Sequence, residues 1–353
     1  MDWNFIIFSV LKIAGVIGIL HAIAAYAVLA ERKISAWIQD RVGPNRTAPP
    51  FMKHIPVLGT FLTRLGIFQP LADGLKFMLK EDFTPASVKK VYFWLAPALA
   101  LIPSMLVIAV IPFGSLIGHQ KMVIADLDVG ILYTFGIVSL GVYGIVLAGY
   151  AANSKYPFLG GIRSSAQLIS YEIAMGLSVI PVFLIAGKLN LTQVIEWQSQ
   201  HGWLILYAPL SFVIFLVAAF AETNRTPFDL PEAETELVGG YHTEYSSMKF
   251  ALFFLAEYSN IVAVSAMMVT LFFGGWSLPI WGLDQPATTV LAGVAHILIF
   301  LIKIGFFLTV FIWVRWMFPR FRYDQLMDLG WRRFLPLALV NIVITAIVLW
   351  LRS

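Results

Sequence analysis

Long apolar runs separated by polar connections are the dominant pattern of this chain. Eight runs are each long enough to cross a hydrocarbon core of about 30 Å as a helix. They are continuous rather than alternating, which favours helices over barrel strands. With 59% hydrophobic residues among 353 and a mean hydropathy of +0.82, the sequence predicts an all-α, polytopic membrane protein with one membrane domain over residues 1–353. The predicted spans are 4–30, 93–113, 131–152, 168–187, 203–222, 249–273, 290–316 and 334–351.

The basic residues predict how these spans are oriented. The connections 31–92, 153–167, 223–249 and 315–333 hold 19 of the 24 Lys and Arg residues. Because basic residues stay on the cytoplasmic side of a membrane, we expect these four connections in the cytoplasm and both termini outside. The first span should be a retained helix rather than a signal peptide, since no small-residue cleavage site follows it.

The first connection predicts two amphipathic elements. Apolar residues recur at helical spacing from Ile34 to Ile38, so the first helix should continue beyond the bilayer until Gly43-Pro44 stops it. Residues 69–82 place their apolar side chains on one helical face and the charge of Asp73 elsewhere. That pattern is typical of a helix in the interface plane, and a helix that only anchors the loop would also fit it.

Carboxylates are concentrated after the fifth span. Residues 221–245 hold six of the 20 acidic residues, against a single Arg225. At 1.5 Å per residue, the predicted spans place Glu222 at the cytoplasmic boundary, Glu172 about 6 Å below it and Glu257 about 12 Å below it. Intramembrane acids are costly and by default mark a path for protons, ions or a polar head group.

Structural ion pairs between helices are the alternative explanation of these acids. Lys303, near the middle of the seventh span, is a candidate charge partner for Glu257. The proton path is favoured because three such acids are many for so apolar a chain.

Composition excludes several other functions. The chain has no Cys, so it cannot hold a disulfide, an iron–sulfur cluster or a thiolate zinc site. It contains no phosphate loop and no dinucleotide fingerprint, and we predict no metal site. Any redox chemistry would have to come from a partner protein or a diffusible cofactor.

Five long strings carry a resemblance that covers most of the chain. They are Glu31–Arg46, Gln69–Lys76, Gly160–Glu172, Ala221–Tyr245 and Arg315–Met327. Together they resemble the membrane-embedded H subunit of bacterial NADH:quinone oxidoreductase (respiratory complex I), whose mitochondrial counterpart is NADH dehydrogenase subunit one.

The resemblance implies a component of a proton-translocating enzyme that is not catalytic alone. Its substrate would be a quinone, either ubiquinone or menaquinone. It would bind no cofactor itself, because the FMN and iron–sulfur clusters belong to partner subunits. Its partners would be the hydrophilic quinone-module subunits, small membrane subunits and membrane lipid, and no nucleic acid. A bacterial inner membrane is favoured over a mitochondrial one.

The resemblance also assigns roles to individual residues. The quinone tunnel would be shaped by Glu31, Arg32, Trp37, Asp40, Arg46, Asp73, Arg225, Phe228 and Asp229. The proton pathway would comprise Glu172, Glu222 and Glu257, with Glu232, Glu234 and Glu236. These last three belong to the connection within 221–245, which we call the acidic loop.

Two other functions compete with this interpretation. The corresponding membrane component of an energy-converting hydrogenase would bind no quinone, and the strings at 69–80 and 221–245 favour the respiratory enzyme. A stand-alone proton-coupled carrier would be expected to show pseudo-symmetric halves or helices broken at mid-membrane, and neither is found in the sequence.

Overall fold

The computed structural model describes residues 3–50, 52, 56–118, 120–231, 234–279 and 283–352. Over these residues the chain is helical apart from its connections and one antiparallel hairpin, so the all-α prediction is confirmed. The elements are α1 (Trp3–Ile38), α2 (Pro56–Leu65), α3 (Gln69–Leu79), α4 (Lys90–Leu106), β1 (Leu116–Ile117), β2 (Gln120–Lys121), α5 (Gly130–Ala151), α6 (Lys155–Ala186), α7 (Leu191–His201), α8 (Pro209–Glu222), α9 (Glu234–Leu237), α10 (Ser247–Phe272), α11 (Val290–Met317), α12 (Tyr323–Asp328) and α13 (Leu335–Arg352).

Seven helices among the described residues are long and apolar enough to cross a membrane, which confirms a multi-pass membrane protein. The predicted span at 203–222 is the exception. Its helix α8 has 14 residues, or about 21 Å at 1.5 Å per residue. Pro209 starts this helix, as is common at a first helical position. The residues before it form only a short 3₁₀ turn, Leu204–Leu206.

The helix of the fourth predicted span begins before residue 168. α6 begins at Lys155, and Gly160-Gly161, a pair typical of turns, lies inside it. A Cβ at Gly160 would stand 2.8 Å from the backbone nitrogen of Tyr241. These glycines therefore allow close backbone approach rather than a turn, as small residues do between membrane helices.

The last span is also longer than its apolar run. α12 continues into α13 through one π-helical turn, Leu329–Phe334. Residues Tyr323–Arg352 therefore form one continuous helical stretch, whereas the sequence predicted a start at residue 334.

The first connection follows the prediction closely. α1 continues past its apolar run to Ile38, and α3 occupies the predicted interfacial helix. α1 ends five residues before Gly43 because Asp40 adopts a left-handed conformation, with φ at 51°. The Arg41 amide then donates to the carbonyl of Ala36 at 2.8 Å, a pattern that satisfies the carbonyls at a helix end.

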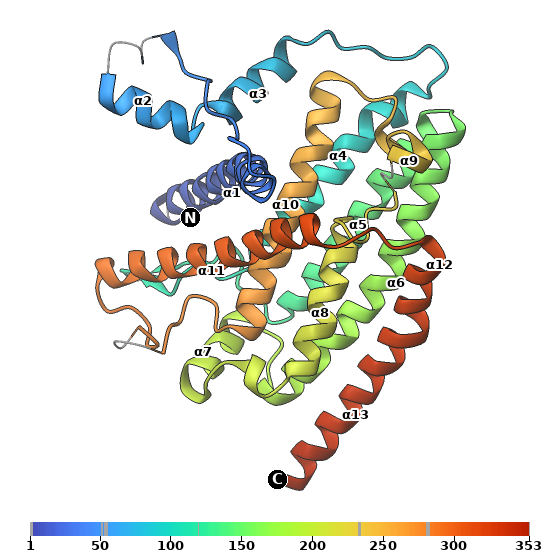
Figure 1. The fold of residues 1–353 in the computed structure, drawn as a ribbon. Coiled ribbons are helices and arrows are strands. Elements are labelled where there is room, and N and C mark those ends of the chain that lie inside the picture. The colour runs from blue at the N-terminus through green and yellow to red at the C-terminus, as the bar shows by residue number, and fades with distance from the viewer. Residues whose placement is uncertain are drawn as a thin grey trace.

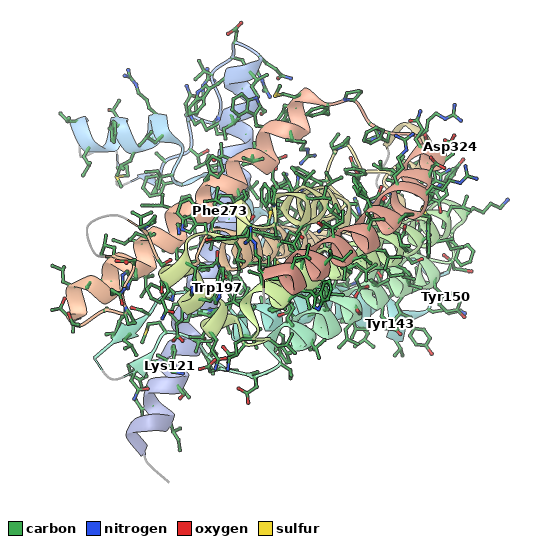
Figure 2. The ribbon with its side chains drawn as sticks, turned by 90° about the horizontal axis from the view of Figure 1, so that it is seen from below. Lys121, Tyr143, Tyr150, Trp197, Phe273 and Asp324 are labelled. Atoms are coloured by element: carbon green, nitrogen blue, oxygen red, sulfur yellow. The ribbon has the colours of Figure 1, made fainter. Side chains whose placement is uncertain are left out.

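The core is centred on α10, and α1 lies at its rim. In the most apolar stretch of each helix, 72% of α10 is buried but only 6% of α1. Figure 1 shows α4, α5, α6, α8 and α10 running roughly side by side, with α11 crossing α10 obliquely. On the outer face of α5, Tyr143 and Tyr150 project away from the bundle (Figure 2). Such outward apolar faces suit a protein whose solvent is lipid.

Candidate functional site

A buried group of charged side chains joins three helices and one loop. Glu31 of α1 is 8% exposed. Its carboxylate lies 3.2 Å from Nη1 of Arg225 and accepts a 2.6 Å hydrogen bond from the Tyr258 hydroxyl. Arg315, near the end of α11, also donates to it. We call Glu31, Arg225, Glu257, Tyr258 and Arg315 the central cluster.

Arg225 connects the two carboxylates of the central cluster. Its Nε lies 2.7 Å from Oε1 of Glu257, and its guanidinium lies 4.6 Å from the ring centre of Tyr258. Burial works against its charge, but Glu257 and Glu31 outweigh burial and raise the pKa of the guanidinium. Two guanidinium groups and two carboxylates make the cluster neutral, which is the usual condition for burying charges.

Lys303 is not the partner of Glu257, so that prediction is wrong. Its ammonium donates to the carbonyls of Phe273, Gly275 and Ser277 at 2.7–3.0 Å. These carbonyls follow the C-terminal end of α10, where a cation is favourable. Lys303 therefore caps a helix end, and the carboxylate of Glu257 is matched by the loop arginine.

The connection after α8 folds back into the bundle and so delivers Arg225. Gln167 of α6 donates to the carbonyls of Ala221 and Phe228 at 2.8 and 2.9 Å. Phe228 is 3% exposed and packs edge-on against Tyr171 at 5.6 Å between ring centres. A glutamine from α6 thus ties the end of α8 to the loop and satisfies the buried carbonyl of Phe228.

Glu222 lies beside the central cluster across a small polar cavity. The cavity measures about 40 Å³ and is lined by Glu222, Glu257, Asn224 and Asn260 among others. Glu222 is 4% exposed, and its Oε2 has no hydrogen-bond partner among the described residues. A cavity of this size exceeds the roughly 10–15 Å³ that one water needs, and it offers polar partners on its walls.

Glu172 extends this group of acids on the other side of Glu222. It accepts a hydrogen bond from Ser139 of α5 and lies close enough to Glu222 for the two carboxylates to interact electrostatically. Glu222 and Glu257 line one cavity, so the structure brings the three acids together. Their depths below the membrane boundary remain predictions.

Two of the predicted tunnel residues pair with each other outside the central cluster. Arg32 and Asp73 form an ion pair at 2.7 Å between α1 and α3. Trp37, Asp40 and Arg46 are exposed, and the structure does not bring them to the cluster. Their predicted roles at a tunnel entrance remain predictions.

The acidic loop contributes two further pairs outside the central cluster. Asp229 pairs with Arg320 at 2.9 Å; burial raises the pKa of this carboxyl, and the charge of Arg320 offsets part of the rise. Glu236 pairs with Arg163 at 2.6 Å. Glu232 and the side chain of Glu234 lie outside the described residues.

Four side chains of the site were missed from the sequence: Tyr258, Arg315, Arg320 and Ser139. Arg315 and Arg320 stand in the string 315–327 that carried the resemblance, and Tyr258 directly follows Glu257, so position alone could have suggested three of them. Nothing in the sequence around Ser139 distinguishes it. Among the described residues, no group of three His, Asp or Glu is placed to hold a metal ion.

Fold and site together define a helical multi-pass membrane protein with a charge-balanced cluster in its interior. The family model described as NADH dehydrogenase matches residues 11–346. The chain is 46% identical to the NADH-quinone oxidoreductase H subunit 1 of Cytophaga hutchinsonii, with 97% of this chain and 96% of that protein covered. It is 48% identical to the H subunit 1 of Geobacter metallireducens, with the same coverage, and 48% identical to NADH-quinone oxidoreductase subunit 8 of Rhodothermus marinus, with 92% of each chain covered. The chain therefore belongs to the NADH dehydrogenase family of membrane subunits.

Proposed function

We propose that this chain forms the membrane part of a quinone-binding tunnel and the first stretch of a proton pathway in a proton-translocating NADH:quinone oxidoreductase. The observation that carries the proposal is Arg225, buried between Glu31 and Glu257. One guanidinium thereby links Glu31, which lines a cavity with mostly apolar walls, to Glu257, which lines a cavity with polar groups.

The quinone would approach the central cluster between α1, α10 and α11. A cavity of only about 10 Å³ there, which would have to widen to admit a quinone head, has the polar groups of Glu31, Arg225 and Arg315 on one side. Its other walls are apolar: Ala27, Ile261, Leu308, Phe311 and Ile312. A quinone has a polar head and an isoprenoid tail, and this division of polar and apolar walls suits such a molecule.

Protons would pass along the acids behind the central cluster. Quinone reduction takes up two protons and changes the charge near Glu31. A change of one pKa unit corresponds to about 1.4 kcal/mol, so shifts of a few units at paired acids store useful energy. Arg225 would transmit the change to Glu257, the polar cavity would connect Glu257 to Glu222, and Glu222 would pass it on to Glu172.

The remaining components would come from other subunits of the enzyme complex. The chain has no cysteine for a cluster, so FMN and iron–sulfur clusters in the hydrophilic subunits would deliver the electrons. Those subunits would dock on the side that carries the 31–92 and 223–249 connections, and small membrane subunits would pack against the spans. The chain would form one domain in a bacterial inner membrane, with both termini outside.

Photolabelling tests the quinone part of the proposal. Membranes with the intact complex would be illuminated with a quinone analogue that carries a photoreactive isoprenoid tail. We expect labelled peptides from α1 around Ala27–Glu31 and from α11 around Leu308–Ile312, and unlabelled quinone should compete. Leu308→Trp should reduce both labelling and NADH:quinone reductase activity, because Leu308 lines the cavity.

The matched control is Ile302→Trp on the same helix, since Ile302 is 71% exposed. This variant should keep both labelling and activity. Labelling confined to other subunits, or equal behaviour of the two tryptophan variants, would refute the tunnel assignment.

A further inference from the structure

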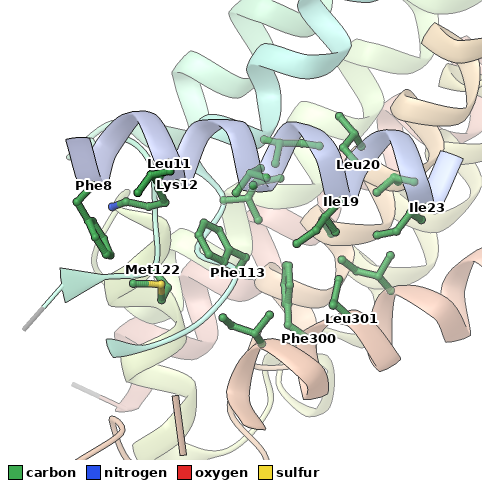
Figure 3. A pocket seen from close by; sticks show the side chains of 18 residues that line it. Phe8, Leu11, Lys12, Ile19, Leu20, Ile23, Phe113, Met122, Phe300 and Leu301 are labelled. Carbon is green, nitrogen blue, oxygen red and sulfur yellow. The ribbon is translucent and has the colours of Figure 1, made fainter. Parts of the chain in front are cut away.

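A second cavity lies between α1 and α11, nearer the N-terminal end of α1 than the cavity at Glu31. Figure 3 shows it between the N-terminal half of α1 and the middle of α11, with α10 as its floor. It measures about 330 Å³, and Lys12 is its only charged lining residue among those described. Its apolar lining includes Leu11, Ile19, Phe113 and Phe300.

The part of this groove inward of Lys12 matches one leaflet of a bilayer. The lining residues of α1 run from Phe8 to Ile23, and from Lys12 to Ile23 the rise is about 16 Å at 1.5 Å per residue. Half of a hydrocarbon core of about 30 Å is about 15 Å. An apolar groove of this length, open on a helix that is mostly exposed, would be filled by a chain that begins at the head-group level and ends near the mid-plane.

Lys12 marks the head-group end of the groove. Its ammonium donates to the carbonyls of Lys121 and Val123 at 3.1 and 2.8 Å, in the connection between α4 and α5 that carries the β1–β2 hairpin. In the predicted orientation α1 begins outside, so Lys12 lies in the outer half of its span, and a lysine side chain can carry its ammonium toward the head groups. An ammonium has three donors, and the third donor of Lys12 has no acceptor among the described residues.

We propose that this groove binds one acyl chain of a membrane phospholipid whose phosphate is held by Lys12. The phosphate supplies the acceptor that the third N–H of Lys12 lacks, and the acyl chain covers the apolar walls. An isoprenoid tail would fill the apolar part equally well, but it offers no anion to Lys12. The lipid site therefore lies at the end of the α1–α11 contact away from Glu31 and is separate from the proposed quinone tunnel.

Two glycines of α1 give a matched pair of variants. An added Cβ would meet nothing within 4 Å at either Gly15 or Gly18. Only Gly15 lines the groove. Gly15→Phe should therefore fill the groove without a clash, whereas Gly18→Phe adds the same ring outside it.

The test uses the intact complex in nanodiscs of phosphatidylcholine with trace phosphatidylglycerol that carries a photoreactive acyl chain. We expect labelled peptides from residues 11–23 and 297–304. Gly15→Phe should abolish this labelling, and Gly18→Phe should retain it. Lys12→Gln should weaken labelling about fivefold, as for one lysine near an anionic head group, while Lys188→Gln on an exposed loop should not.

Three outcomes would overturn the lipid site. Equal labelling in the two phenylalanine variants would place the lipid elsewhere. Loss of labelling with added quinone but not with added phosphatidylglycerol would make the groove part of the quinone tunnel. The absence of any label in residues 11–23 and 297–304 would mean that another protein of the complex covers the groove.

Discussion

α1 and α11 line two cavities with different chemistry, one toward each end of the contact between them. At the end that contains Glu31 and Arg315, one side of the cavity carries a carboxylate and two guanidinium groups, and the other walls are apolar. At the end that contains Lys12, the walls are apolar and one ammonium stands at the rim. The charges of the central cluster therefore have partners of opposite sign from other elements, whereas the ammonium of Lys12 contacts backbone carbonyls.

The difference shows how much the polar end depends on one residue. Arg225 contacts both buried carboxylates, and removing one member of a buried ion pair leaves the other charge uncompensated. The apolar end has no such dependence, because each of its side chains contributes only contact area.

The largest effect is expected from Arg225→Met. Without the guanidinium, Glu257 loses its described ion partner and Glu31 keeps only Arg315, and the cost should be about 3–5 kcal/mol. We expect little assembled complex in membranes, measured by blue native electrophoresis. Arg32→Met is the control, because the exposed pair with Asp73 is worth about 0–1 kcal/mol. Equal amounts of complex in both variants would contradict the importance of the buried cluster.

A smaller effect is expected from Tyr258→Phe. The ring and its contact with Arg225 remain, but Glu31 loses its 2.6 Å hydrogen bond, and hydrogen bonds to charged groups are worth about 1.5–3 kcal/mol. The complex should assemble with lower thermal stability and reduced NADH:quinone reductase activity. Tyr143→Phe on the exposed face should change neither property, and a parallel loss there would show that the cluster is not the cause.

The smallest effect on stability is expected from Glu234→Gln combined with Glu236→Gln. The ion pair that this double variant removes, Arg163–Glu236, is partly exposed and worth about 0–1 kcal/mol. The complex should assemble normally but lose both NADH:quinone reductase activity and proton pumping. Glu81→Gln, in another exposed connection, is the control. Full activity in the double variant would make the acidic loop a docking surface only.

Sequence patterns predicted the long helices better than the connections. α10 and α11 begin and end within two residues of the predicted spans, because their apolar runs coincide with their helices. α6 begins well before its apolar run, since its first turns pack against the 240–241 backbone through Gly160. A hydropathy pattern indicates which residues contact lipid, and it does not reveal where a helix continues through polar residues packed against the protein.

The members of the site were partly predictable, but their pairing was not. Glu31, Arg225 and Glu257 were all expected at functional positions, and the structure brings them together. The partner of Glu257 was expected to be Lys303, which lies in a span, because charges were matched between spans only. Arg225 reaches the interior because its loop folds back into the bundle, where Gln167 hydrogen-bonds to it. The hydrophobic periodicity of the sequence cannot predict such a tertiary contact.

The most direct measurement is proton pumping by the assembled complex that carries Glu257→Gln. The amide keeps an oxygen that can accept from Arg225, so the complex should assemble, as checked by NADH oxidation with an artificial acceptor. If the carboxylate of Glu257 passes the charge change from the quinone site to the proton path, pumping should be lost while Glu81→Gln pumps normally. Full pumping with Glu257→Gln would remove this residue, and the link through Arg225, from the mechanism.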